Sequence, residues 1–88
     1  MIVREVPIVN SLGLHARPAA EFVKIANRFR SAVAVRKDAM EVNGKSIMGM
    51  MMLAAECGSA LTIRADGDDA EAALAALSDL VRAGFGED

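Results

Sequence analysis

His15 is the only histidine in the chain, and it lies in a segment whose residue types are suited to holding a phosphoryl group. Gly13 precedes it, and Arg17 and Pro18 follow at the start of a stretch with helical periodicity. The first N–H groups of a helix have no partner within the helix, and the helix dipole adds positive charge there, so such an end binds anions. Arg17 would add a permanent charge and donors that match phosphate. Since a neutral imidazole is a nucleophile near pH 7, the segment predicts a phosphoryl-carrying histidine.

Other interpretations of His15 are simpler or need more residues than the chain has. His15 could be a surface histidine near a helix cap, with Arg17 a solvated arginine. A nucleophilic hydrolase is disfavoured because no second histidine is present to act as its base. A zinc site is disfavoured because the one histidine and the one cysteine, Cys57, are far apart in sequence. The local chemistry leaves the phosphoryl site and the surface histidine open.

A second candidate segment begins at Ser46 and continues as the apolar run from Ile47 to Ala55. Ser46 is expected to cap a short helix at its N-terminus. Helical spacing groups Met50 with Leu53 on one side, and on the other side it groups Ile47, Met48 and Met51. One set should belong to the core, and the other should be a surface for partner proteins, where flexible thioethers adapt to several shapes. The alternative is a helix that is buried on all sides.

Length and composition limit the classes to which the chain can belong. Its 88 residues predict one domain, 1–88, and 53% hydrophobic residues are enough for a core. A formal net charge of −2 with only three aromatic residues disfavours binding to nucleic acid or to an anionic membrane. The N-terminus has no signal-peptide pattern. One cysteine, expected to be buried or half-buried, fits a reducing compartment, so we expect a cytoplasmic protein.

The chemistry-bearing segments must be positioned by alternating strands and helices. Apolar periodicity predicts strands at 2–9, 32–36, 40–42 and 61–65, and helical segments at 16–28, 47–55 and 70–81. Pro7 lacks an N–H, which favours an edge position for the first strand. Asp68 or Asp69 can cap the last helix, and Gly84 can end it. The order β-α-β-β-α-β-α predicts an α+β fold with helices on one face of a mainly antiparallel sheet.

The run Gly13-Leu14-His15-Ala16-Arg17-Pro18-Ala19-Ala20 resembles the active-site signature of a known family. That family comprises the histidine phosphocarrier proteins (HPr) of the phosphoenolpyruvate-dependent phosphotransferase system, and the resemblance covers essentially the whole chain. It implies that His15 carries the phosphoryl group on Nδ1 and that Arg17 assists. It also implies an open-faced β-sandwich, with three helices over a four-stranded antiparallel sheet of order 1-4-2-3. The donor would be enzyme I and the acceptor an enzyme IIA-type protein, with no cofactor and no metal.

The resemblance extends to the segment from Gly44 to Gly49, which looks like the regulatory serine segment of HPr proteins. It implies that Ser46 is phosphorylated by HPr kinase/phosphorylase, whereas a helix cap alone would need no kinase. It also assigns the outward side of the helix, because Ile47, Met48 and Met51 match the docking positions of the family.

Two positions depart from the family pattern. Leu12 stands where many relatives have a small polar residue, and Phe85 stands where some have an acidic residue near the arginine. The roles of those positions are not transferred to this chain. The loop 10–13 and the ending 83–88 are more similar to the nitrogen-related branch, whose carrier is called NPr.

The sequence therefore predicts a monomeric phosphoryl carrier, not an enzyme that turns over a substrate. The alternative is a purely regulatory binding module that is switched at Ser46 and whose His15 does not cycle.

Overall fold

The computed structural model describes residues 1–87, so Asp88, the last residue of the ending compared with the nitrogen branch, lies outside it. The strands are β1 (Ile2–Pro7), β2 (Ala32–Lys37), β3 (Met40–Asn43) and β4 (Ala60–Asp66). The helices are α1 (Ala16–Ala26), α2 (Ile47–Met52) and α3 (Ala70–Arg82), followed by a 3-10 turn, η1 (Gly84–Gly86). The predicted order of elements is confirmed, and their ends move by a few residues at most, except that α2 stops well before Ala55.

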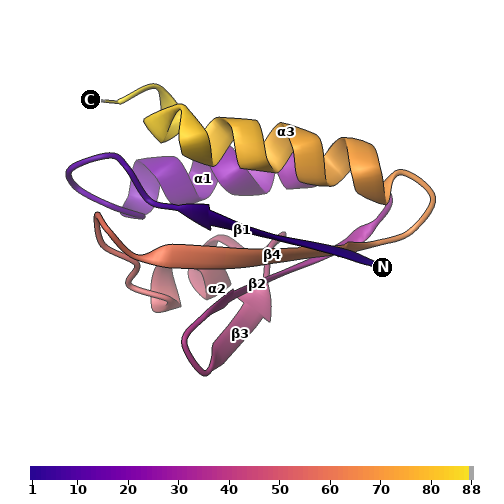
Figure 1. Cartoon of the computed structure of the whole chain (residues 1–88), viewed down its shortest axis with the longest axis horizontal. Coiled ribbons are helices and arrows are strands. Elements are labelled where there is room, and N and C mark those ends of the chain that lie inside the picture. Colours follow the sequence, from indigo (N-terminus) through magenta and orange to yellow (C-terminus); the bar gives the residue numbers. More distant parts are fainter. Residues whose placement is uncertain (88) are drawn as a thin grey trace.

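The four strands form one antiparallel sheet in the order β1-β4-β2-β3, as the family resemblance implied. β1 lies at an edge and pairs with β4 from Ile2, opposite Ala65, to Pro7, opposite Ala60. The edge position predicted from Pro7 is therefore confirmed. Figure 1 shows α1 and α3 side by side over one face of the sheet.

The core lies between this face and the helices. Alternate residues of β4, Leu61, Ile63 and Ala65, are completely buried, and all three helices contribute apolar side chains to the same cluster. Its largest helical members are Phe22 from α1, Met50 from α2, and Leu74 and Leu77 from α3. Burying one such side chain contributes about 1.5–3 kcal/mol, so this packing fixes the helices on the sheet. No helix formed by residues 1–87 is long and apolar enough to cross a membrane.

Asp69 stands at the cap position of α3, but its side chain makes no capping hydrogen bond there. Its carboxylate instead accepts hydrogen bonds from the backbone N–H groups of Arg30 and Ser31 and from the Ser31 hydroxyl. The hydrogen bond from the Ser31 hydroxyl, followed by that from the Arg30 N–H, lowers the pKa of Asp69 to about 2. Asp69 therefore ties the start of α3 to the segment before β2, and the prediction that it caps α3 is wrong in its side-chain role.

Cys57 is exposed, so the prediction of a buried or half-buried cysteine is also wrong. It lies in a turn between α2 and β4, where the Ser59 N–H donates to the Glu56 carbonyl at 2.9 Å. The turn directs the side chain away from the core, with Sγ 3.8 Å from the Val9 carbonyl.

Candidate functional site

His15 occupies the position immediately before α1, and its backbone is extended as expected for a cap residue. Its side chain makes no capping hydrogen bond, and 36% of the side chain remains exposed. The N–H groups of Ala16 and Arg17, at the start of the helix, have no carbonyl one turn earlier in the helix to bond with. His15 therefore stands at a helix end whose first N–H groups have no partner within the helix, as predicted.

Gly13 brings the loop before His15 against the segment that follows α2. The Leu14 N–H donates to the Ala55 carbonyl at 2.8 Å, and Gly13 has a φ of +69°. A Cβ atom on Gly13 would lie 2.5 Å from the Ala55 carbonyl oxygen and 2.8 Å from Cα of Glu56. Only glycine fits here, because any side chain would collide with the backbone of Ala55 and Glu56.

The C-terminal end of the chain supplies a carboxylate to His15. Glu87 Oε1 lies 3.0 Å from Nε2 of His15, and the Glu87 side chain is only 18% exposed. The same oxygen accepts a hydrogen bond of 3.1 Å from Nδ2 of Asn10, which also donates to the Gly13 carbonyl at 2.7 Å. Asn10 is completely buried. Figure 1 shows the end of α3 and the loop between β1 and α1 at the same end of the molecule.

The pKa of Glu87 is changed by the groups that surround it. The pKa of Glu87 is lowered, first by the hydrogen bond from His15 and further by that from Asn10, while its partial burial acts in the opposite direction. The charges of His15 and Arg17 lower it further. Arg17 itself is exposed. The structure therefore groups His15, Arg17, Glu87 and Asn10 at one end of the molecule.

Glu87 and Asn10 were not predicted from the sequence. Glu87 is 72 residues from His15, and no local periodicity connects the two. At the departure noted at Phe85, no role was transferred to the chain end, and the structure shows that Glu87, two residues further on, brings a carboxylate to the site. Gly84 and Gly86 on either side of Phe85 did indicate a turn, but they could not indicate where the turn leads.

Ser46 is the cap residue of α2, as predicted. Its Oγ accepts a hydrogen bond from the Gly49 N–H at 3.1 Å, and the residue is half-buried.

The two sides of α2 differ in burial as the helical spacing predicted. Met50 is completely buried and Leu53 is 4% exposed, whereas Ile47, Met48 and Met51 are 45%, 75% and 44% exposed. The alternative of a helix buried on all sides is therefore wrong. Outside this set, Met52 and Leu12 are also exposed, at 64% and 74%. The four exposed side chains of α2 give the protein an apolar surface on that helix, and Leu12 is a further exposed apolar side chain, in the loop before His15.

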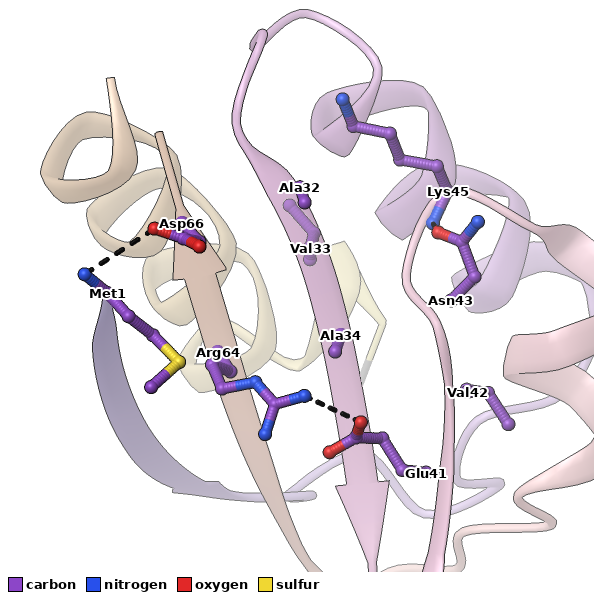
Figure 2. Close-up of a pocket in the computed structure, with 10 residues that line it drawn as sticks. All are labelled: Met1, Ala32, Val33, Ala34, Glu41, Val42, Asn43, Lys45, Arg64 and Asp66. Atoms are coloured by element: carbon purple, nitrogen blue, oxygen red, sulfur yellow. Dashed lines mark hydrogen bonds and ion pairs between the residues drawn. The ribbon is translucent and has the colours of Figure 1, made fainter. Parts of the chain in front are cut away.

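A hollow of about 640 Å³ lies elsewhere, on the sheet between β2, β3 and β4. Figure 2 shows two pairs among its charged groups, Arg64 with Glu41 at 2.6 Å and the amino group of Met1 with Asp66 at 3.6 Å. The ammonium of Lys45 donates instead to the Phe29 carbonyl at 2.7 Å. None of the predicted site residues lines it. Within residues 1–87, no three or more His, Cys, Asp or Glu side chains are arranged to hold a metal ion. The hollow thus contains none of the side chains to which chemistry was assigned, and the candidate chemistry stays at the start of α1.

Comparison with known proteins gives consistent matches over the whole chain. A family model described as the PTS HPr component phosphorylation site matches residues 2–83. Phosphocarrier protein HPr from Neisseria meningitidis is 47% identical, over 99% of this chain and 98% of its own. The HPr-like protein Crh from Bacillus subtilis is 46% identical, over 93% of this chain and 96% of its own. The crystal structure of HPr from Thermoanaerobacter tengcongensis has a TM-score of 0.95 and 48% identity, covering 100% of this chain and 99% of that one.

Proposed function

The chain belongs to the HPr family of phosphocarrier proteins of the phosphotransferase system, and we propose that it carries its phosphoryl group on His15. The role of the family is that of a carrier and not of a catalyst. We further propose enzyme I as the donor and an enzyme IIA-type protein as the acceptor. The observation that carries the proposal is the imidazole at the free N-terminal end of α1, with Nε2 held by Glu87 and no hydrogen bond made by the side chain to the helix.

In the proposed reaction the lone pair of Nδ1 attacks phosphorus in line with the bond to the donor, which breaks as the new N–P bond forms. Positioning and electrostatic stabilisation supply most of the rate in such transfers. The free N–H groups at the start of α1 and the Arg17 guanidinium provide positive charge beside the phosphoryl oxygens. Transfer to the acceptor reverses these steps and returns a neutral imidazole.

The proposal is tested by incubating the protein with phosphorylated enzyme I and measuring its mass before and after acid treatment. Phosphohistidine is acid-labile and phosphoserine is not, so one phosphoryl group should be gained and then lost in acid. A His15→Ala protein that still gains the acid-labile group would contradict the assignment to His15.

We propose in addition that Ser46 is a regulatory phosphorylation site for HPr kinase/phosphorylase. A phosphoserine carries about −1.5 to −2 charges, which the N-terminal end of a helix tolerates well. The fold should therefore survive, and the added charge would act on partners that dock on Ile47, Met48 and Met51. We propose these three exposed side chains as the docking surface.

A purely regulatory module, switched at Ser46, is the second candidate. It is favoured by the similarity to the HPr-like protein Crh and by the capping geometry of Ser46. Loss of phosphoryl uptake in His15→Ala, with phosphorylation of Ser46 retained, would not separate the two candidates. Uptake by the wild-type protein from phosphorylated enzyme I separates them, because the regulatory module takes up none.

We also propose that the protein acts in the cytoplasm as a monomer, because the same site must face the donor and the acceptor in turn. Sedimentation at the concentration used for the transfer assay tests the monomer, and a dimer that transfers at full rate would contradict it.

A further inference from the structure

The backbone after α3 is left-handed at three consecutive residues. Gly84, Phe85 and Gly86 are all left-handed, with φ values of +65°, +58° and +76°. Residues with a side chain rarely adopt this region, and they keep it only where surrounding structure holds them. Phe85 is held by burial, since it is 8% exposed and belongs to the core cluster. The turn sends the chain back from the end of α3, and the next residue, Glu87, reaches His15.

Asn10 donates to the same oxygen of the Glu87 carboxylate that contacts His15. Its amide nitrogen donates to both Glu87 Oε1 and the Gly13 carbonyl, so these two acceptors decide which way the amide points. Its amide oxygen is buried and makes no hydrogen bond with residues 1–87. Burying an amide oxygen without a hydrogen bond costs free energy. The two hydrogen bonds that the Asn10 amide nitrogen donates offset this cost and hold the side chain in position. One of the two fixes the loop of His15, and the other fixes Glu87.

We propose that Glu87 is a positioning residue that keeps His15 in the tautomer with its proton on Nε2. A carboxylate can only accept hydrogen bonds, so the ring nitrogen 3.0 Å from it must carry the hydrogen. Nδ1 of the neutral ring is then unprotonated, with its lone pair available to phosphorus. This inference rests on the proposed function of His15, to which it adds the group that selects the reacting nitrogen.

The same contact suits the phosphorylated state. When the Nδ1–P bond forms and the bond from phosphorus to the donor breaks, Nε2 keeps its proton and the ring takes on positive charge. The Glu87 carboxylate lies against that N–H and stabilises the charge, as a carboxylate does for an imidazolium in a catalytic triad. On transfer to the acceptor the N–P electron pair returns to Nδ1, and the ring is again neutral with its proton on Nε2. No proton needs to leave the ring in either direction.

Two variants and one control separate the positioning role from a general effect of charge. Glu87→Ala removes the acceptor, whereas Glu87→Gln keeps an oxygen that can accept from Nε2 and removes the charge. Glu71→Gln removes the same charge from an exposed position in the first turn of α3, whereas Glu87 follows the last turn of that helix. A thermal melt of each protein checks that the fold is intact.

The first measurement is the ¹⁵N NMR spectrum of the His15 ring in the unphosphorylated proteins, at a pH where the ring is neutral. The wild type, Glu71→Gln and Glu87→Gln should each show one tautomer, with the proton on Nε2, and Glu87→Ala should show a mixture. The second is the rate of phosphoryl uptake from phosphorylated enzyme I. This rate should fall about three- to tenfold in Glu87→Ala and less in Glu87→Gln, and should be unchanged in Glu71→Gln.

A wild type with both tautomers, or a Glu87→Ala protein with the same single tautomer as the wild type, would overturn the inference. So would equal uptake rates in Glu87→Ala and the wild type. If the wild type takes up no phosphoryl group, the proposed function of His15 fails, and the ring spectra still decide whether Glu87 sets the tautomer.

Discussion

Replacing Met48 by aspartate should weaken docking to enzyme I while the fold stays intact. Met48 is 75% exposed, so its side chain gives little burial to lose and the substitution should change stability by about 0.5 kcal/mol or less. It is also the second residue of α2, where an acidic side chain interacts with the helix dipole favourably by about 0.3–1 kcal/mol. In the docked state, however, the new carboxylate must be desolvated without a partner, which costs roughly 1–3 kcal/mol. The dissociation constant should therefore rise about five- to 150-fold.

Two matched substitutions make the measurement specific. Met50→Asp, two residues on, removes a completely buried side chain at a cost of about 2–5 kcal/mol and buries a charge in addition. A domain of this length has about 4–13 kcal/mol of stability in total, so this variant should be largely unfolded. Val3→Asp places the same charge on β1, at a side chain that is 55% exposed and outside the proposed docking surface. It should bind enzyme I as the wild type does.

Binding is measured by titration calorimetry with enzyme I, and folding by circular dichroism melts of the same samples. If Met48→Asp binds with wild-type affinity, the surface of Ile47, Met48 and Met51 is not the docking site. If it unfolds instead, Met48 contributes to the core despite its exposure, and the reasoning from burial is wrong.

Three further predictions concern single side chains. Arg17→Ala should slow phosphoryl transfer to His15 and change stability by about 0.5 kcal/mol or less, because Arg17 is exposed; equal transfer rates would remove its role. Ser46→Asp should slow phosphorylation of His15, more at low salt than at high salt, with an unchanged melt, because its charge lies beside the docking surface but at a favourable helix end. An unchanged rate at low salt would reduce Ser46 to a helix cap. Asp69 has its pKa lowered in the folded state from 3.8 to about 2, so its stabilisation is complete above pH 3.8 and is lost as pH falls towards 2. Asp69→Asn should lower the melting temperature at neutral pH. It should also reduce the decrease in melting temperature between pH 3.8 and about 2, and the same decrease as in the wild type would show that Asp69 is not its cause.

The parts of the fold that could be predicted from the sequence depend on local patterns. Alternation in β4 and the helical spacing in α2 separate buried from exposed residues because each side of a regular element has one environment. Gly13 was singled out because it precedes His15, and the structure adds that it packs against the backbone of Ala55 and Glu56. The strand order came from the family resemblance and not from these patterns, since periodicity carries no information about which strands pair.

The features that could not be predicted depend on contacts between distant segments. Asp68 or Asp69 was expected to cap α3, since a cap can be recognised from its own segment. Arg30 and Ser31, however, offer Asp69 three donors that only the folded chain brings to it. Glu87 reaches His15 through a turn that a buried Phe85 holds in a conformation unusual for its residue type. Tertiary packing therefore overrode the local preference at both positions.

The place of β4 in the sheet has a consequence for how the protein is made. Of the four strands β1 leaves the ribosome first, yet it pairs with β4, which is synthesised last. The hairpin of β2 and β3 can form as soon as it emerges, whereas the pairing of Ile2 with Ala65 must close a loop that contains most of the molecule. The nascent chain must therefore keep β1 without its partner strand until β4 has been made, and the Leu14 N–H before His15 likewise bonds to a carbonyl, that of Ala55, that is made only shortly before β4.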